Sequence, residues 1–293
     1  MKHKSIVPVC LSVLALIALP VSSFAQLLGN GFGGTLYDIN TATGAATNPR
    51  STGQTFVVGI TFDSSGNLYG LTTFASSSPS SLVRINPTTG ASVVVGPTGL
   101  SNIFEGDIAY NPTNGNLYGI QDVPSSGARN LFRINAATGN ATTIGALPGT
   151  NTDFSALAFN AAGVLYALDT ATATATLYVI NPLTAGLISS VVTNVRLGST
   201  AALAFDPVTG IAYLADGSTN GTNLLYTLNT TTGVATPVGP LGITDLAGLA
   251  FRPAANQAVP DSGTSLLLLA FAFASLYLAR EHLTERVRSP QAT

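Results

Sequence analysis

Apolar and polar positions alternate along most of the chain in short runs, separated by turns rich in Gly, Asn and Asp. One recurring unit reads apolar-Ala-aromatic-Asp/Asn, a Gly turn and then Leu-Tyr-Gly-Leu, as in Ile60–Leu71 and Ile108–Ile120. A second unit reads Leu-x-x-Ile-Asn followed by a Thr-rich turn, as in Leu82–Gly90. Each unit places two runs of β-forming residues around an Asx/Gly turn and therefore predicts a β-hairpin.

The two hairpin units recur at a nearly constant spacing. The aromatic residue of the first unit recurs at steps of 48, 49, 46 and 46 residues, at Phe62, Tyr110, Phe159, Phe205 and Phe251. The Asn of the second unit recurs at steps of 46, 49, 46 and 48, at Asn40, Asn86, Asn135, Asn181 and Asn229. Two hairpins in a repeat of about 47 residues give the four strands of a propeller blade. The alternation excludes helical repeats, and the coils of a β-solenoid are usually shorter.

The ends of the repeat region determine the number of blades. Four complete blades begin near Ile60, Ile108, Leu157 and Leu203. A second hairpin without its first stands at Leu36–Val58, and a lone first strand stands at Leu246–Arg252. With Leu27–Phe32 as the missing strand, these pieces make a fifth blade, and closure removes the exposed sheet edges. The sequence predicts an all-β, five-bladed β-propeller over residues 26–257; four blades with an unclosed flank is the alternative.

The N-terminal segment 1–25 predicts export. Lys2 and Lys4 precede an apolar run from Ile6 to Leu19, and Ser23-Phe24-Ala25 gives a small-x-small site. This is the pattern of a secretory signal peptide that signal peptidase removes after Ala25, with an uncleaved anchor helix as the alternative. The only cysteine, Cys10, lies in this segment, so the predicted mature chain has neither disulfides nor thiolate chemistry.

The C-terminal segment 258–293 combines a short motif, an apolar run and a basic tail. The motif is Val259, Pro260, Asp261, Ser262 and Gly263, and the tail carries Arg280, Arg286 and Arg288. The run over 264–279 predicts a short transmembrane helix. At about 1.5 Å per residue it is shorter than the roughly 30 Å hydrocarbon core, so it requires local thinning or snorkelling by Arg280. A buried core helix is the alternative.

This arrangement resembles the C-terminal sorting signals of PEP-CTERM-type proteins, in the VPDSG variant. The resemblance covers Val259 to Arg288, and Glu281 and Glu285 depart from the usual tight arginine cluster. It implies an exosortase-type processing enzyme as a partner and membrane attachment through the C-terminal helix before processing. It also implies a final location in the bacterial envelope, at the cell surface or outside the cell, among exopolysaccharide or surface proteins.

Composition narrows the possible chemistry. Only 8% of residues are charged, too few basic groups for nucleic-acid binding. His3 and His282 lie in the end segments, and residues 26–258 contain no His, Cys, Lys, Met or Trp. This region cannot build a Ser–His or Cys–His nucleophile, a His/Cys zinc site or a lysine Schiff base. We therefore expect a propeller that is not an enzyme and carries no cofactor.

Carboxylates remain as candidate functional groups. Asp63 and Asp206 open first-hairpin turns, where Asn occurs in other repeats, and predict a backbone role. Seven other acids lie at strand ends that meet at one mouth of the predicted channel: Glu105, Asp107, Asp122, Asp153, Asp169, Asp216 and Asp245. Such a ring suits a polar ligand or a divalent cation such as calcium, which prefers oxygen ligands. Solvated turn residues are the alternative.

The function predicted from these features is that of an exported binding or adhesion module of the cell surface or extracellular matrix. A purely structural matrix protein and a carboxylate-dependent glycan hydrolase are the alternatives. Arg84 and Arg133 hold the third-strand position that Asp38 holds in another repeat. This placement predicts surface ion pairs between neighbouring blades, which contribute little to stability.

Overall fold

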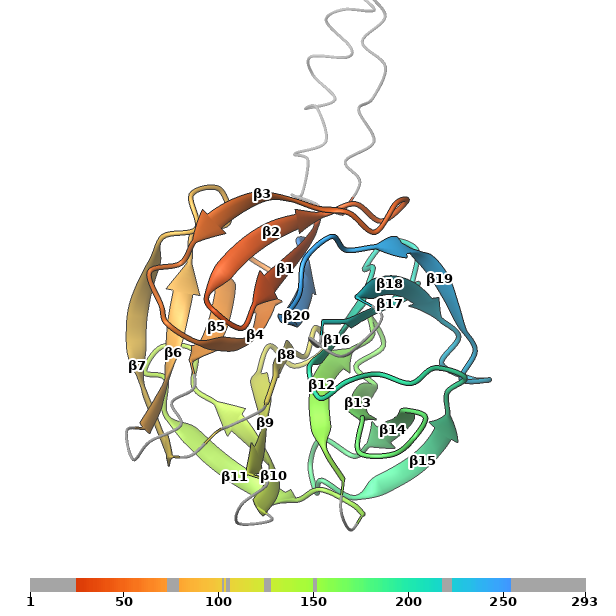
Figure 1. The fold of residues 1–293 in the computed structure, drawn as a ribbon. Helices are drawn as coiled ribbons and strands as arrows, with labels where there is room; N and C mark the ends of the chain where they lie inside the picture. Colours follow the sequence, from red (N-terminus) through yellow and green to blue (C-terminus); the bar gives the residue numbers. More distant parts are fainter. Residues whose placement is uncertain are drawn as a thin grey trace, which may run out of the picture.

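The computed structural model describes residues 25–72, 79–101, 103, 106–123, 128–149, 152–217 and 223–253. In these residues twenty strands form five antiparallel sheets of four strands each, and the sheets surround a central axis as a five-bladed β-propeller (Figure 1). The predicted fold is thus confirmed for the described residues. None of them forms a helix long and apolar enough to span a membrane. The predicted signal peptide, except Ala25, and the segment 258–293 lie outside this part of the chain.

Four blades are continuous in sequence, and each runs from an innermost strand at the axis to an outermost strand at the rim. The first comprises β4 (Val57–Phe62), β5 (Leu68–Thr72), β6 (Pro79–Ile85) and β7 (Ser92–Ser101). The second comprises β8 (Ile108–Tyr110), β9 (Leu117–Val123), β10 (Ala128–Ile134) and β11 (Ala141–Ala146). The third comprises β12 (Phe154–Phe159), β13 (Leu165–Asp169), β14 (Thr176–Ile180) and β15 (Leu187–Val192). The fourth comprises β16 (Ala201–Phe205), β17 (Ala212–Asp216), β18 (Leu224–Leu228) and β19 (Ala235–Pro240).

The fifth blade joins the two ends of the propeller. Its innermost strand is β20 (Leu246–Phe251), which pairs with β1 (Leu27–Gly31), followed by β2 (Thr35–Ile39) and β3 (Ala46–Ser51). The N–H of Arg252 donates to the carbonyl of Gln26 at 2.8 Å, so the chain enters and leaves the propeller at adjacent points. The closure predicted from the sequence is confirmed, and the alternative of four blades with an open flank is wrong.

Tight turns hold the hairpins as their sequence predicts. In the turn after β6, Asn86 Oδ1 accepts the N–H groups of Thr88 and Thr89 at 2.9 and 3.1 Å. Gly90 closes this turn with φ of 83°, a conformation that glycine adopts without steric cost. Asp63 and Asp206 play the same backbone role in first-hairpin turns, because their Oδ1 atoms accept the N–H groups of Ser65 and Val208. Their predicted role is confirmed.

Neighbouring blades pack through the repeated aromatic residue. A second-strand tyrosine contacts the innermost-strand phenylalanine of the next blade in the pairs Tyr118–Phe159, Tyr166–Phe205 and Tyr213–Phe251, with ring centroids 5.1, 5.0 and 5.4 Å apart. In the closing blade Leu28 holds the tyrosine position and packs in one cluster with Phe62. The period of aromatic residues in the sequence is therefore the period of the interblade contact.

The ion pair of Asp38 differs from its prediction. Arg50 Nη2 donates to Asp38 Oδ1 at 2.8 Å, and both residues belong to the same blade. The register of β2 and β3 places Arg50 opposite Leu36, two residues from Asp38, so the long arginine side chain reaches Asp38 within the same sheet. The prediction of a pair between blades is therefore wrong for Asp38, while Arg84 and Arg133 lie exposed.

Candidate functional site

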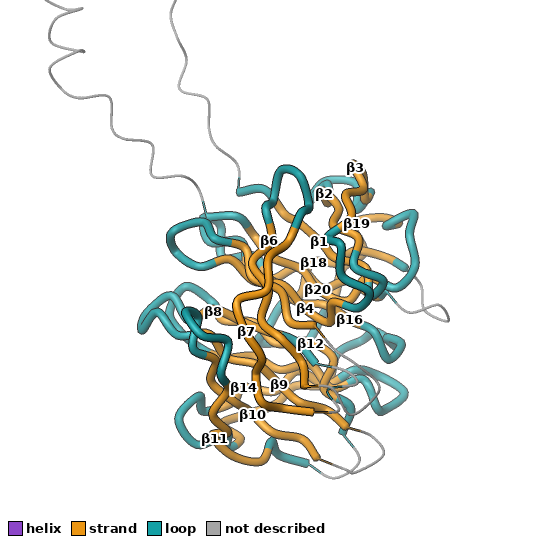
Figure 2. Tube along the Cα trace, turned by 90° about the vertical axis from the view of Figure 1, so that its left-hand side faces the viewer, coloured by secondary structure: helices purple, strands orange, loops and turns teal. Residues whose placement is uncertain are grey.

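The innermost strands surround a channel whose two openings differ in chemistry, and loops and turns lie at both sides of the disc (Figure 2). The N-terminal strand ends form what we call the polar mouth, a cavity of about 180 Å³ lined by Phe32, Val58, Gly106, Ser155, Ser199, Thr200, Asp245 and Ala247. The C-terminal strand ends form the apolar mouth, also about 180 Å³ and lined by residues 60–62, 108–110, 112, 157–161, 203–205, 207 and 249–251.

Phe32 is fixed at the rim of the polar mouth by its own backbone. Its N–H donates to the carbonyl of Asp245 at 2.7 Å, and its carbonyl accepts the N–H of Val57 at 3.0 Å. Its half-buried ring lies 5.1 Å from that of Phe56. No sequence pattern singles out Phe32, because it lies in the irregular link after β1, where the hairpin repeat gives no signal.

Asp245 lies exposed at the same mouth, directly before β20. Its φ of 63° is uncommon for a residue other than glycine, and such strained residues cluster at functional sites. Its N–H donates to the carbonyl of Gly217 and its carbonyl accepts from Phe32. Both backbone groups are thus used for positioning, and Asp245 lines the mouth as an exposed residue. Among the predicted ring acids whose side chains the structure describes, Asp245 is the one that lines this cavity.

Two other predicted carboxylates are buried and bonded to loop backbone. Asp169 is 3% exposed, and its Oδ1 accepts the N–H groups of Asp153 and Ala171 at 2.8 and 3.0 Å. Asp216 is fully buried, and its Oδ1 accepts the N–H of Gly198 at 3.2 Å. Each ties the end of a second strand to the loop that enters the innermost strand. The structure thus brings Asp153 and Asp169 together, but the Asp169 carboxylate is engaged in positioning the loop.

Asp107 lies deeper, between the innermost strands. Its carboxylate is 1% exposed and spans two strands, because Oδ2 accepts the N–H of Leu157 and Oδ1 the N–H of Ile108, both at 2.8 Å. Gly59 on β4 leaves the space, since a Cβ there would lie 2.0 Å from Asp107 Oδ1. Burial raises the pKa of this carboxyl well above its usual value, although the two backbone hydrogen bonds oppose the rise.

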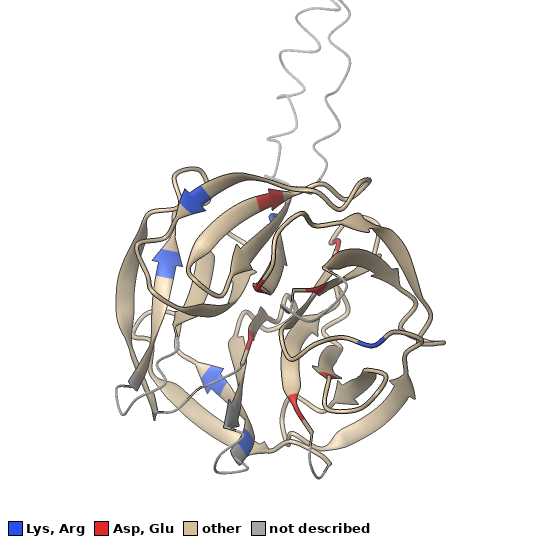
Figure 3. Cartoon of the chain, in the orientation of Figure 1, with Lys and Arg blue, Asp and Glu red and all other residues tan. Residues whose placement is uncertain are grey.

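The described members of the predicted ring of seven acids lie in different surroundings: Asp107, Asp169 and Asp216 are buried, whereas Asp245 is exposed. Glu105 lies outside the described residues, and only the backbone of Asp122 is described, within β9. Figure 3 shows most acidic residues around the channel and most arginines nearer the rim. Within the described ranges, no three His, Cys, Asp or Glu side chains come together in a way that could hold a metal ion. Calcium binding stays a prediction without support from these residues.

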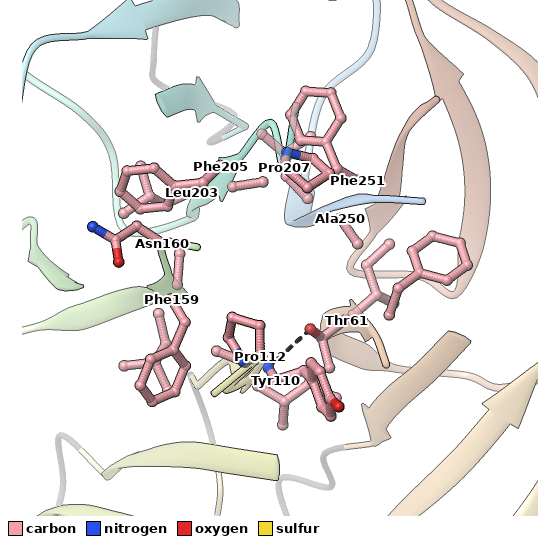
Figure 4. Close-up of a pocket in the computed structure, with 18 of the residues that line it drawn as sticks. Thr61, Tyr110, Pro112, Phe159, Asn160, Leu203, Phe205, Pro207, Ala250 and Phe251 are labelled. Atoms are coloured by element: carbon pink, nitrogen blue, oxygen red, sulfur yellow. Dashed lines mark hydrogen bonds between the residues drawn. The ribbon is translucent and has the colours of Figure 1, made fainter. Parts of the chain in front are cut away.

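The apolar mouth is built from side chains of all five innermost strands (Figure 4). Its described lining residues carry no charge. Thr61 Oγ1 accepts the N–H of Tyr110 at 3.1 Å across two blades. The other four repeats have alanine at the position of Thr61, at Ala109, Ala158, Ala204 and Ala250. This mouth therefore offers methyl groups and ring edges together with the uncharged polar residues Thr61, Tyr110 and Asn160.

Comparisons with known proteins give a family of unknown function and distant structural likenesses. Residues 106–257 match the sequence profile of a family described as a repeat of unknown function (DUF6923). Similar solved structures include a chain of a nidogen/laminin complex, with 15% identity, coverage of 78% of this chain and 99% of that chain, and a TM-score of 0.49. They also include a putative gluconolactonase, with 15% identity, coverage of 77% and 81%, and a TM-score of 0.46. No curated protein matches the sequence.

Proposed function

The chain belongs to the DUF6923 family, a repeat of unknown function, and we propose that it is a non-enzymatic binding module whose ligand occupies the polar mouth. One observation carries this proposal: the backbone link between Phe32 and Asp245 holds an aromatic residue and an exposed acidic residue at one concave opening. Pockets that combine apolar surface with a few placed polar groups are the usual form of a ligand site.

The chemistry of this mouth suits a neutral saccharide. The Asp245 carboxylate accepts hydrogen bonds from sugar hydroxyls, and the hydroxyl groups of Ser155, Ser199 and Thr200 both donate and accept them. The ring of Phe32 offers an apolar face for the C–H groups of a sugar ring. A segment of exopolysaccharide is therefore the ligand that we propose.

The same proposal places the protein outside the cytoplasm. It is supported by the signal-peptide pattern of residues 1–25 and by the motif Val259–Gly263 with its apolar run and arginines. Signal peptidase and an exosortase-type enzyme are then its processing partners, and the C-terminal run holds it in the membrane before processing. Intact-mass measurement of the cell-surface protein tests this part: retention of residues 1–25 or of 264–279 would contradict processing at that end.

Binding is tested with glycan arrays and calorimetry on the purified chain. We expect saturable binding of an extended glycan, and at least about tenfold weaker binding of Asp245→Asn, because a charged hydrogen-bond acceptor contributes about 1.5–3 kcal/mol. Asp206→Asn is the matched control, since Asn111 and Asn160 hold the equivalent turn position in other blades. Binding that is unchanged in Asp245→Asn would exclude the polar mouth. Absence of any saturable ligand would favour the structural matrix protein, and release of cleaved sugar would favour the hydrolase.

A further inference from the structure

Exposed aliphatic side chains gather on the side of the apolar mouth. The turns within both hairpins lie on this side, because the first and third strands of each blade run toward it. Of the nine exposed large apolar residues in the described chain, four lie in these turns: Leu183, Val208, Ile211 and Val234. Four more fall within the first three residues of an outermost strand that leaves such a turn: Val93, Val94, Leu187 and Ile188.

The turns themselves do not require these side chains. Leu183 is 77% exposed, and the same turn position carries Thr or Ala in the other repeats, at Ala42, Thr88, Ala137 and Thr231. Val208 is 67% exposed, where the corresponding turn of the β8–β9 hairpin has Thr113. The turn hydrogen bonds are made by Asn181 and Asp206, which accept from the backbone of Leu183 and Val208. Apolar side chains that no turn requires, and that gather on one side of the molecule, mark a contact surface.

The chain also leaves the propeller on this side. Leu27 pairs with Phe251, which lines the apolar mouth, so both ends of the described chain emerge there. Ten residues, 254–263, separate Pro253 from the apolar run over 264–279. At about 3.3–3.6 Å per residue, this linker spans at most roughly 36 Å. Whatever holds the apolar run therefore lies within a short distance of this side.

We infer that the apolar-mouth side rests on a lipid bilayer, with Leu183, Val208 and Ile211 inserted among the headgroups. The inference rests on the membrane-held form of the proposed function. Lipid fits better than a protein partner because these side chains protrude from separate turns of two neighbouring blades, and the cavity that Leu183 borders is also lined by Arg133, which suits an anionic headgroup. Arg84, Arg133 and Arg252 are exposed near the same side and suit anionic headgroups. The polar mouth then opens away from the membrane, toward its ligand.

The test compares a dye attached on the apolar-mouth side with a dye attached on the opposite side. It uses the full chain in vesicles of phosphatidylcholine and phosphatidylglycerol. Because Cys10 is the only cysteine, Cys10→Ser gives a cysteine-free background. Val208→Cys and Leu183→Cys then carry an environment-sensitive dye on the apolar-mouth side. Ala173→Cys, in the exposed β13–β14 loop at the opposite side, is the matched control. We expect brominated lipid to quench the dye at residues 208 and 183 several times more strongly than at residue 173.

The other outcomes overturn the inference in distinguishable ways. If the chain floats with the vesicles but the dye is quenched weakly and equally at all three positions, the apolar-mouth side does not face the membrane, although the chain is anchored to it. If the chain does not float with the vesicles, this result contradicts both the anchor and the membrane-facing side. Glycan binding at the polar mouth is measured separately. If the dye at residue 208 is protected without lipid and the chain has the mass of a dimer, this surface binds a second copy. If it is protected and the chain has the mass of a monomer, this surface binds the tail of the same chain.

Discussion

The two mouths of the channel are built from the same five strands but differ in origin. The apolar mouth lies at the hairpin turns, where the repeated pattern of Asn or Asp, Thr and Gly fixes the backbone in nearly the same way each time. The polar mouth lies where blades are joined, and there the repeat is interrupted by Phe32 and Asp245. The difference teaches that the repeat specifies the scaffold, whereas departures from it supply the chemistry.

The largest expected difference in stability is between variants of two phenylalanines, Phe159 at the apolar mouth and Phe32 at the polar mouth. Phe159→Ala removes a buried ring that packs on Tyr118 between blades, and we expect a loss of about 3–5 kcal/mol in the free energy of unfolding. Phe32→Ala removes a half-buried ring at the rim, and we expect a loss of about 1 kcal/mol together with loss of glycan binding. Urea denaturation of both variants measures the difference. Equal destabilisation would contradict a functional role for Phe32.

The region between the mouths should tolerate little added volume. Gly59→Ala places a Cβ against the carboxylate and Cα of Asp107, at 2.0 and 2.8 Å, and we expect a loss of about 1–3 kcal/mol from overpacking. Gly33→Ala is the control, since a Cβ there meets no atom within 4 Å. It should change stability by less than about 0.5 kcal/mol. A stable Gly59→Ala variant would show that Asp107 is free to move.

Asp107 should make the stability of the propeller depend on pH. Because burial raises its pKa in the folded state above the unfolded value near 3.8, its contribution is fully present below that value and is lost as pH rises through the folded pKa. Relative to Asp107→Asn, the wild type should therefore gain stability between neutral pH and about pH 4. Denaturation curves at several pH values measure this slope. A difference that stays constant with pH would mean that Asp107 titrates normally.

The smallest expected change in stability is at Asp245, where backbone strain and ligand binding can be measured separately. Asp245→Gly relieves the left-handed φ of 63°, and we expect a gain of up to about 0.5 kcal/mol in stability, since the greater freedom of glycine in the unfolded chain offsets part of the relief. The same change removes the carboxylate and should weaken ligand binding. Thermal melts and calorimetry on one sample measure both quantities. A variant that is less stable yet binds normally would contradict the assignment of Asp245.

Much of the scaffold could be predicted because its determinants are local. Asn86 and Gly90 specify a turn within five residues, and the spacing of Phe62 and Tyr110 gives the blade period. The site could be predicted only in part. Asp169 and Asp245 both end up near blade connections as expected, but only the structure shows that loop N–H groups engage Asp169. Phe32 contacts Asp245 because the fifth blade brings the two ends of the propeller together, and no local sequence pattern encodes that contact.

Because the fifth blade contains strands from both ends of the propeller, it is completed last. When a chain is made from its N-terminus, β1, β2 and β3 exist as a sheet with an open inner edge until β20, the last strand, has appeared. Pairing of such distant segments is intrinsically slow, because the chain between them must first be ordered. A chain interrupted before Leu246 would therefore remain a ring with a gap, whose unpaired edge at β1 is a template for association with other strands.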